Sequence, residues 1–295
     1  MKKLDPSIES TRTMFGYMLS AIGPRPIAFA STIDNDGNKN LSPFSFFNVF
    51  SSNPPILVFS PARRGKDAST KDTFENVKAT KEVVINVVTE DIVHQMNLAS
   101  TEYDTATDEF VRAGFTPIAS EHVKPYRVKE SPVHFECKVN DIIQLGEGGG
   151  AGNLVICQVL MMHVDESVLN ELGNIDPNKL KLVARMGASF YSKGFGDALF
   201  EINKPTSNNN IGIDGLPGNI KNSTILTGND LGQLGCLENL PSSTEIATIK
   251  DNADVKAILD TYSNDDNSRV EALHNLAKQM IKEGKIDIAC RILMV

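Results

Sequence analysis

Residues 22–62 read IGPRPIAFASTIDNDGNKNLSPFSFFNVFSSNPPILVFSPA, and this stretch decides the expected fold. Short apolar runs alternate in it with turn residues. The pair Asp36-Gly37 lies between two such runs, where it is a hairpin-turn signal. The run EVVINVV at 82–88 continues the pattern. We therefore expect a mainly β domain at this end of the chain.

Two segments interrupt the β pattern as short helices. STKDTFENVKATK at 69–81 is the first, with Ser69 or Thr70 as its expected N-cap. TEDIVHQMNLA at 89–99 is the second, with Thr89 and an acidic first turn at its start. The expected domain is thus mainly β with short helices.

A second β region follows at 133–164. In VHFECKVNDIIQL the apolar residues share odd positions, with one break at Asp141, which is typical of a half-buried strand. These residues are Val133, Phe135, Cys137, Val139, Ile143 and Leu145. NLVICQVLMMHV at 153–164 is nearly continuous and predicts a strand covered on both sides. A simple hairpin register centred on the glycine stretch between these strands does not place Cys137 opposite Cys157.

The stretch GEGGGAGN at 146–153 lies between these two strands. A Walker-type loop ends in Gly-Lys-Ser/Thr, and both it and a Rossmann loop lead into a helix. Here no Lys or Ser/Thr follows, and the next segment is a strand. The glycines therefore predict a hairpin loop that permits positive φ and a close backbone approach.

The character of the chain changes after about residue 205. KPTSNNNIGIDGLPGNIKNS at 204–223 resembles a linker or an irregular arm. Helices are expected at 252–263 and 267–284, the latter stopped by Gly284. We expect two domains, 1–205 and an α-rich C-terminal extension at 206–295.

Composition excludes several classes of function. The formal net charge of −8 argues against nucleic acid as a partner. No apolar run approaches the roughly 18 residues of a membrane span, and no signal peptide is expected. Four scattered cysteines without a CxxC pair indicate reduced thiols and a cytoplasmic protein. The five histidines show no metal-ligand spacing, so no metal site is expected.

Several motifs in order resemble one family. Besides residues 22–62 and 69–88, they are MNLAS, ESPVHFECKV, NLVICQVLMMHVD and ARMGASFY, which together span roughly residues 10–200. The chain resembles the flavin reductase-like proteins with an FMN-binding split β-barrel, the group that includes flavoredoxin. The resemblance implies the split β-barrel fold, bound FMN, and a homodimer with FMN at or near the subunit interface.

The resemblance also implies the residues of the cofactor site. Those that line the flavin are Arg25, Ser31, Thr32, Ser45, Phe46, Phe47, Asn48 and Ser60. Those that hold its phosphate end are Lys71, Asp72 and Thr73. FMN needs phosphate donors, hydrogen bonds to ribityl and ring atoms, and a flat apolar slot, which these residue types offer. Without the resemblance, SFFNVF reads as core aromatics, and the cluster of Arg63, Arg64, Lys66 and Lys71 reads as a solvated loop.

Two further residues enter the site through the resemblance. Many flavin reductases carry a Gly-Asp-His-like turn where this chain has Gly152-Asn153. Asn153 donates a hydrogen bond but does not exchange a proton near neutral pH, and we expect it near the isoalloxazine ring. Arg185 either balances charge on a reduced flavin or is an exposed arginine near a turn.

The function implied is flavin-dependent electron transfer. FMN accepts a hydride from NADH or NADPH and passes electrons to a free flavin, an iron centre, a small protein or another acceptor. No acid/base residue is named, because hydride transfer needs none. The alternatives are a non-enzymatic electron carrier or FMN-holding protein, which Asn153 and the extension favour, and a split-barrel oxidase of the pyridoxamine-phosphate type.

Overall fold

The structure is a computed structural model that describes residues 1–105, 107–202, 204–205 and 209–295. Residues 206–208 of the expected linker lie outside the described residues. The chain forms two compact units, Met1–Phe200 and Glu201–Val295, and each is described by itself.

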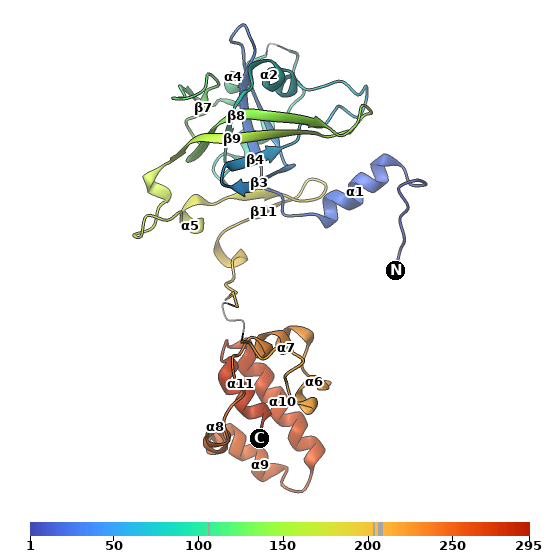
Figure 1. Ribbon diagram of the computed structural model, residues 1–295, viewed down its shortest axis with the longest axis vertical. Coiled ribbons are helices and arrows are strands. Elements are labelled where there is room, and N and C mark those ends of the chain that lie inside the picture. Colours follow the sequence, from blue (N-terminus) through green and yellow to red (C-terminus); the bar gives the residue numbers. More distant parts are fainter. Residues whose placement is uncertain (106, 203, 206–208) are drawn as a thin grey trace. The chain divides into compact units, whose positions relative to one another are not determined.

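The first unit is built on a seven-stranded sheet in which every neighbouring pair is antiparallel (Figure 1). Its strand order is β2-β1-β5-β8-β9-β4-β3, so the early hairpins β1–β2 and β3–β4 lie at opposite ends of the sheet. The expected mainly β fold is confirmed here. The strands are β1 (Ala28–Ile33), β2 (Lys39–Phe44), β3 (Phe47–Ser52), β4 (Pro55–Phe59), β5 (Glu82–Asn86), β8 (Val133–Gln144) and β9 (Asn153–Val164).

The sheet curls so that its two ends meet through side chains. Phe44 of β2 and Phe59 of β4 have ring centroids 5.5 Å apart, although their strands lie near opposite ends of the strand order. Both belong to one buried cluster with Ala28, Ala30 and Val83. A sheet that closes by packing here and not by a hydrogen-bonded ladder is a split barrel.

Short helices and two small ribbons complete this unit. The helices are α1 (Thr11–Ala21), α2 (Asp72–Thr80), α3 (Val93–Leu98), α4 (Glu109–Ala113) and α5 (Pro177–Leu180), with 3₁₀ turns at Glu166–Val168 and Gly196–Ala198. The ribbons pair β6 (Pro117–Ile118) with β7 (Arg127–Val128) and β10 (Val183–Arg185) with β11 (Tyr191–Lys193).

The expected N-caps of the two predicted helices are wrong. α2 begins at Asp72 with Lys71 as N-cap. The hydroxyls of Ser69 and Thr70 instead bond the side chains of Asp67 and Glu75. α3 begins only at Val93, because Thr89 forms a backbone bridge to Leu182.

Strand β8 does not keep the predicted alternation. A register shift between Val139 and Asp141 moves the next core position to Ile142. Ile143 and Leu145 are therefore 44% and 63% exposed, not buried. A bulge that inserts one residue reverses which side chains face the core.

Strand β9 is also not covered on both sides as predicted. Its first half alternates buried and half-buried residues, and Leu160 and Met162 are each 43% exposed. The hairpin register is as expected: Cys137 lies opposite Val159 and Cys157 opposite Val139, and all four thiols of the chain are free.

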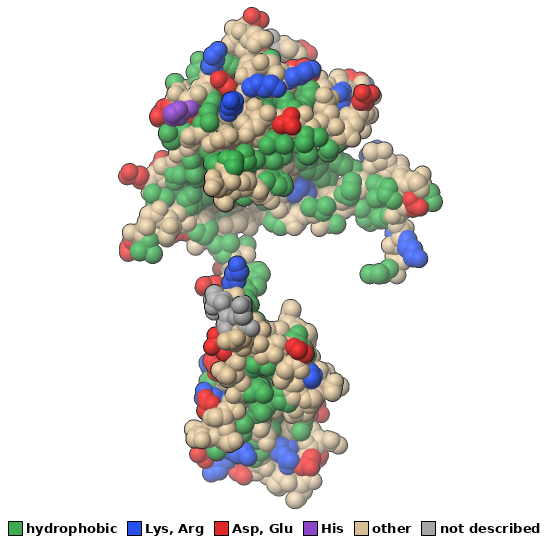
Figure 2. Space-filling model, in the orientation of Figure 1, with side chains coloured by type: hydrophobic (Ala, Val, Ile, Leu, Met, Phe, Trp, Pro, Cys, Tyr) green, Lys and Arg blue, Asp and Glu red, His purple; other side chains and the backbone are tan. Residues whose placement is uncertain are grey.

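Large hydrophobic side chains remain exposed on the first unit, and Figure 2 shows such side chains gathered on the face in view. Among them are side chains of helix α1, of β3 and of the segment after β10, with exposed fractions of 68% at Phe50 and 73% at Phe190. None of the residues of α1 is buried.

The second unit is helical, as expected for the α-rich extension. Its helices are α6 (Gly218–Lys221), α7 (Gly228–Gly235), α8 (Ser243–Ile249), α9 (Ala253–Thr261), α10 (Asp266–Lys282) and α11 (Ile286–Leu293). α9 and α10 confirm the two predicted helices, and Gly284 follows α10 with φ +75°. α7 and α8 carry capping boxes that begin at Thr227 and Ser242. A core that includes Leu234, Val255 and Ala277 holds the helices together.

Candidate functional site

Three distant segments meet at Ser60, which directly follows β4. Its hydroxyl accepts a hydrogen bond from the backbone N–H of Asn153 at 3.0 Å. Its own N–H donates to the carbonyl of Phe46 at 2.8 Å. Ser60 therefore joins the 44–48 segment to the start of β9, and three residues expected at the flavin lie together.

The start of α2 lies beside the same segment. The Lys71 ammonium is 5.5 Å from the ring centroid of Phe44. Burial lowers the pKa of Lys71, Glu102 opposes this shift and Arg64 adds to it. Lys71 makes no capping bond to the helix, which leaves the first N–H groups of α2 to face an anion. Thr105 approaches the Asp72 carboxylate at 3.4 Å.

A buried amide–hydroxyl network supports the start of α2 from the sheet. The Asn40 side chain donates to Thr32 at 3.1 Å and to Thr73 at 2.8 Å. Asn76 donates to Thr32 at 3.1 Å. Thr32 and Ser31 are 0% exposed, and the Ser31 hydroxyl has no hydrogen-bond partner among the described residues. The network fixes the position of Thr73, which is 1% exposed.

The glycine stretch forms the β8–β9 hairpin loop, as predicted. Gln144 lies opposite Asn153 in the register. The close approach that the glycines permit is to the chain itself: a Cβ on Gly149 would lie 2.8 Å from the Gly65 carbonyl oxygen. Arg63 exchanges backbone bonds with 150–151, at 2.8 and 3.1 Å. The loop therefore packs on the segment after Ser60.

Two buried polar atoms of this region lack a partner among the described residues. They are the Nε of Arg63 and the Oδ1 of Asn153. The Asn153 amide is oriented, since its Nδ2 donates to the Pro61 carbonyl at 2.8 Å. Its oxygen is thus a buried acceptor that needs a donor, and Arg63 offers a donor that needs an acceptor.

The three expected residues of β3 and its entry differ in environment. Phe47 packs into the barrel core, whereas Phe46 is 36% exposed and its ring lies 6.0 Å from that of Phe15. Asn48 is exposed, and its side-chain oxygen accepts from the backbone N–H of Val49.

Arg25, Ser45 and Arg185 lie together in a second group. The buried Arg25 guanidinium donates to the carbonyls of Leu19, Ile22 and Met186, at 2.7, 2.7 and 2.9 Å, and lies 3.5 Å from the Ser45 hydroxyl. Its backbone pairs with that of Arg185. Arg25 therefore holds the end of α1 and the turn after β10.

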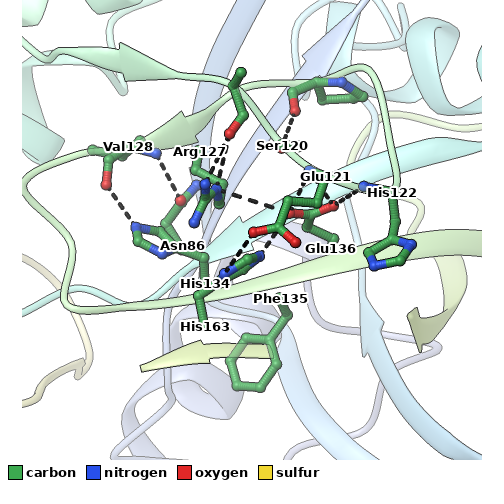
Figure 3. Close-up of polar contacts among 12 residues, drawn as sticks. Asn86, Ser120, Glu121, His122, Arg127, Val128, His134, Phe135, Glu136 and His163 are labelled. Carbon is green, nitrogen blue, oxygen red and sulfur yellow. Dashed lines mark hydrogen bonds and ion pairs between the residues drawn. The ribbon is translucent and has the colours of Figure 1, made fainter. Parts of the chain in front are cut away.

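A separate buried carboxylate, that of Glu136, lies on strand β8 (Figure 3). Glu136 is 0% exposed and accepts hydrogen bonds from the backbone N–H groups of Glu121 and His122 at 2.6–3.0 Å. The His163 Nε2 lies 2.7 Å from it, and the Arg127 Nε lies 3.8 Å away. These contacts tie the 121–127 loop to the sheet.

The neighbouring His134 is also buried. Burial lowers its pKa, and its Nε2 lies 2.8 Å from the Val128 carbonyl. Its Nδ1 has no partner among the described residues. In the part of the chain that the structure describes, no group of three or more His, Cys, Asp or Glu side chains could hold a metal ion. No helix in that part is long and apolar enough to cross a membrane.

Two residues of the region around Ser60 and Lys71, Phe44 and Arg63, were not among the expected cofactor residues. Phe44 lies in the quoted stretch, and its place under Lys71 follows from the closure of the barrel. Arg63 belongs to the recognised basic cluster. Its pairing with the glycine loop joins segments more than 80 residues apart, for which one sequence carries no signal.

The comparisons with known proteins agree with this architecture. The family profile described as "Flavin reductase like domain" matches residues 21–181. An uncharacterized protein of Aquifex aeolicus is 36% identical over 190 residues, which are 64% of this chain and 94% of that protein. The second unit lies outside the profile match.

Two solved structures are also similar. Nitrilotriacetate monooxygenase component B from Bacillus cereus is 30% identical, with a TM-score of 0.64 over 68% of this chain and 98% of that one. A protein described as a flavin reductase with split barrel domain, from Shewanella frigidimarina, is 28% identical, with a TM-score of 0.57 over 67% and 95% of the two chains.

Proposed function

Because the chain belongs to the flavin reductase-like family, we propose that its first unit binds FMN and carries electrons from NADH or NADPH to an acceptor. The acceptor is a free flavin, a metal centre or a protein. When bound, the flavin supplies the hydride-accepting chemistry. The protein residues bind it, orient it and set its electrostatic surroundings.

One observation carries the proposal: the Arg63 Nε and the Asn153 Oδ1 lack a partner among the described residues, and their segments meet at Ser60 and the glycine loop. A flavin offers ring and phosphate acceptors to the first of these atoms. It offers a ring N–H and ribityl hydroxyls to the second. A donor and an acceptor without partners on adjoining segments fit a ligand that is both donor and acceptor, as FMN is.

The remaining residues divide between the two ends of the cofactor. We assign the phosphate end to the start of α2, where Lys71, Asp72 and Thr73 combine a cation with free helix N–H groups. We assign the ring end to residues 45–48 and to Asn153. Thr32 supports the start of α2 from within β1, and Arg25 positions Ser45. We assign Ser31, the neighbour of Thr32 on β1, to the same flavin site.

The assembly we propose is a homodimer. The exposed apolar side chains of α1, β3 and the segment after β10 form a surface of the kind that marks protein interfaces. Four free thiols fit a reducing cytoplasm. Sedimentation velocity tests the dimer, and a monomer at micromolar concentration contradicts it.

The cofactor assignment is tested by Lys71→Gln, with Lys78→Gln on the exposed side of the same helix as control. We expect Lys71→Gln to weaken FMN binding about tenfold, or about 1.4 kcal/mol, because a contact to phosphate is lost. Riboflavin lacks the phosphate, so its binding stays unchanged in both variants. Quenching of flavin fluorescence measures both affinities. A wild-type protein that binds no FMN contradicts the assignment.

A second function, an electron carrier that never meets a nicotinamide, is favoured by Asn153. Its backbone N–H donates to Ser60 and its carboxamide donates to the Pro61 carbonyl. The carboxamide does not exchange protons near neutral pH. Anaerobic mixing of the FMN-loaded protein with NADH and NADPH separates the two functions. Loss of the visible flavin absorption supports the reductase, and an unchanged spectrum with both donors leaves the carrier.

A further inference from the structure

A small cavity opens beside the proposed flavin site. Its volume is about 160 Å³, close to the roughly 150 Å³ of an engineered cavity that holds benzene. Ile27 and Met96 supply apolar walls, while Ser45, Asn97, Arg185 and Tyr191 supply polar groups. The cavity therefore has room for one six-membered ring with a small substituent.

The charge of the cavity is positive and is not neutralised by the protein. The Arg185 guanidinium lies 4.7 Å from the ring centroid of Tyr191 and donates to the Ala188 carbonyl. Within the described ranges, no carboxylate forms an ion pair with Arg185 or Arg25. Arg25 already donates to three carbonyls and to the Ser45 hydroxyl. The Arg185 fork thus keeps donors for an anion.

The position of the cavity links it to the flavin. Ser45 lines the cavity. Its neighbour Phe44 lies under Lys71, and its other neighbour, Phe46, bonds Ser60. Within residues 44–46, Ser45 therefore lines the cavity and its two neighbours contact the proposed cofactor site. An occupant of the cavity lies beside the flavin.

We propose that this cavity is a substrate subsite for a small single-ring carboxylate, whose anionic group pairs with Arg185. The role of the carboxylate as a substrate rests on the proposed function, whereas its binding to the cavity does not. A planar bidentate fork suits a carboxylate. A neutral ring of the same size gains no such pair. A nicotinamide ring, which carries a neutral carboxamide, is thereby disfavoured.

Benzoate and its neutral analogue benzamide are the probes, titrated by calorimetry and ligand-detected NMR into the full chain with and without saturating FMN. We expect benzoate to bind at least tenfold more tightly than benzamide or nicotinamide. Arg185→Gln weakens benzoate binding at least tenfold. The control Arg112→Gln leaves it unchanged, although Arg112 also lies over a tyrosine ring, 5.9 Å from that of Tyr103.

A second variant, Ser100→Leu, fills the cavity from its exposed rim and leaves Arg185 in place. It abolishes benzoate binding without a change in melting temperature. The proposal is overturned if benzamide or nicotinamide binds as well as benzoate. It is also overturned if Arg185→Gln binds like the wild type, or if FMN displaces benzoate, since the cavity then belongs to the flavin. Benzoate binding in a chain that rejects FMN supports the anion site and refutes the proposed function.

Discussion

Replacement of Glu136 removes the carboxylate that holds the 121–127 loop to the sheet. Its oxygens accept from the N–H groups of Glu121 and His122 and contact His163. Glu136→Ala leaves both backbone donors and the histidine without their acceptor in a fully buried place. Glu136→Gln keeps the shape and one acceptor, but it turns an N–H₂ group toward donors.

The size of each effect follows from these contacts. Glu136 also lies 3.8 Å from the Arg127 guanidinium, and removal of one partner of a buried ion pair costs about 3–5 kcal/mol, which we expect for Glu136→Ala. We expect about 1–3 kcal/mol for Glu136→Gln, the cost of one unsatisfied polar group. In a unit of this size each kcal/mol lowers Tm by about 2–4 °C, so Glu136→Ala melts on the order of 10 °C below the wild type.

The effect also depends on pH. Burial alone raises the pKa of Glu136, but the Glu121 and His122 N–H groups and His163 outweigh it, and the net pKa is lowered. A lowered folded pKa stabilises the protein above the unfolded value of about 4.3, and this stabilisation is lost as pH falls through the folded pKa. The difference between wild type and Glu136→Gln therefore shrinks in acid below about pH 4.

Thermal unfolding followed by circular dichroism measures these changes, since the chain contains no tryptophan. The strand signal reports the first unit separately from the helical one. The control is Glu121→Gln, an exposed carboxylate 3.9 Å from the same histidine, which changes stability by at most about 0.5 kcal/mol. If Glu136→Ala unfolds within 1 °C of this control, the carboxylate does not hold the loop and the reasoning is refuted.

Three further predictions concern other parts of the chain. Burial raises the pKa of Glu109 to about 6, so its contribution is present below about pH 4.3 and is lost as pH rises through 6. The unfolding free energy of the wild type therefore falls relative to Glu109→Gln over that range, and a flat difference contradicts this. Cys236 is the exposed cysteine and the other three are buried, so a thiol reagent labels one thiol per native chain quickly and four only after unfolding. Gly149→Ala places a methyl group against the Gly65 carbonyl and costs about 1–3 kcal/mol in chemical unfolding, whereas Gly148→Ala meets no atom within 4 Å and is nearly neutral.

Local patterns predicted the parts of the fold that depend on local physics. The Asp36-Gly37 turn, the β8–β9 hairpin and helices α9 and α10 follow from turn chemistry and periodicity. The alternation in β8 failed at Val139–Asp141, because a bulge is set by pairing with β9 and not by the strand's own residues. The expected cap at Thr89 failed because a bridge to residue 182 took precedence.

The candidate site was likewise predicted in part from local motifs, while its long-range contacts were not. Ser60, Phe46 and Asn153 were named from motifs, and the structure brings them within hydrogen-bond distance. The separation of Arg25 and Arg185 into a second group was not predictable. It depends on three carbonyls contributed by α1 and by the turn at Met186.

The strand order has a consequence for synthesis on the ribosome. The hairpins β1–β2 and β3–β4 emerge early, but β4 has its other neighbour in β9, about a hundred residues later. Until β9 leaves the exit tunnel, β4 presents an open edge that another nascent chain can pair with. The barrel therefore forms as a unit only after its last long hairpin arrives, and chains that stop before Asn153 are the ones expected to aggregate.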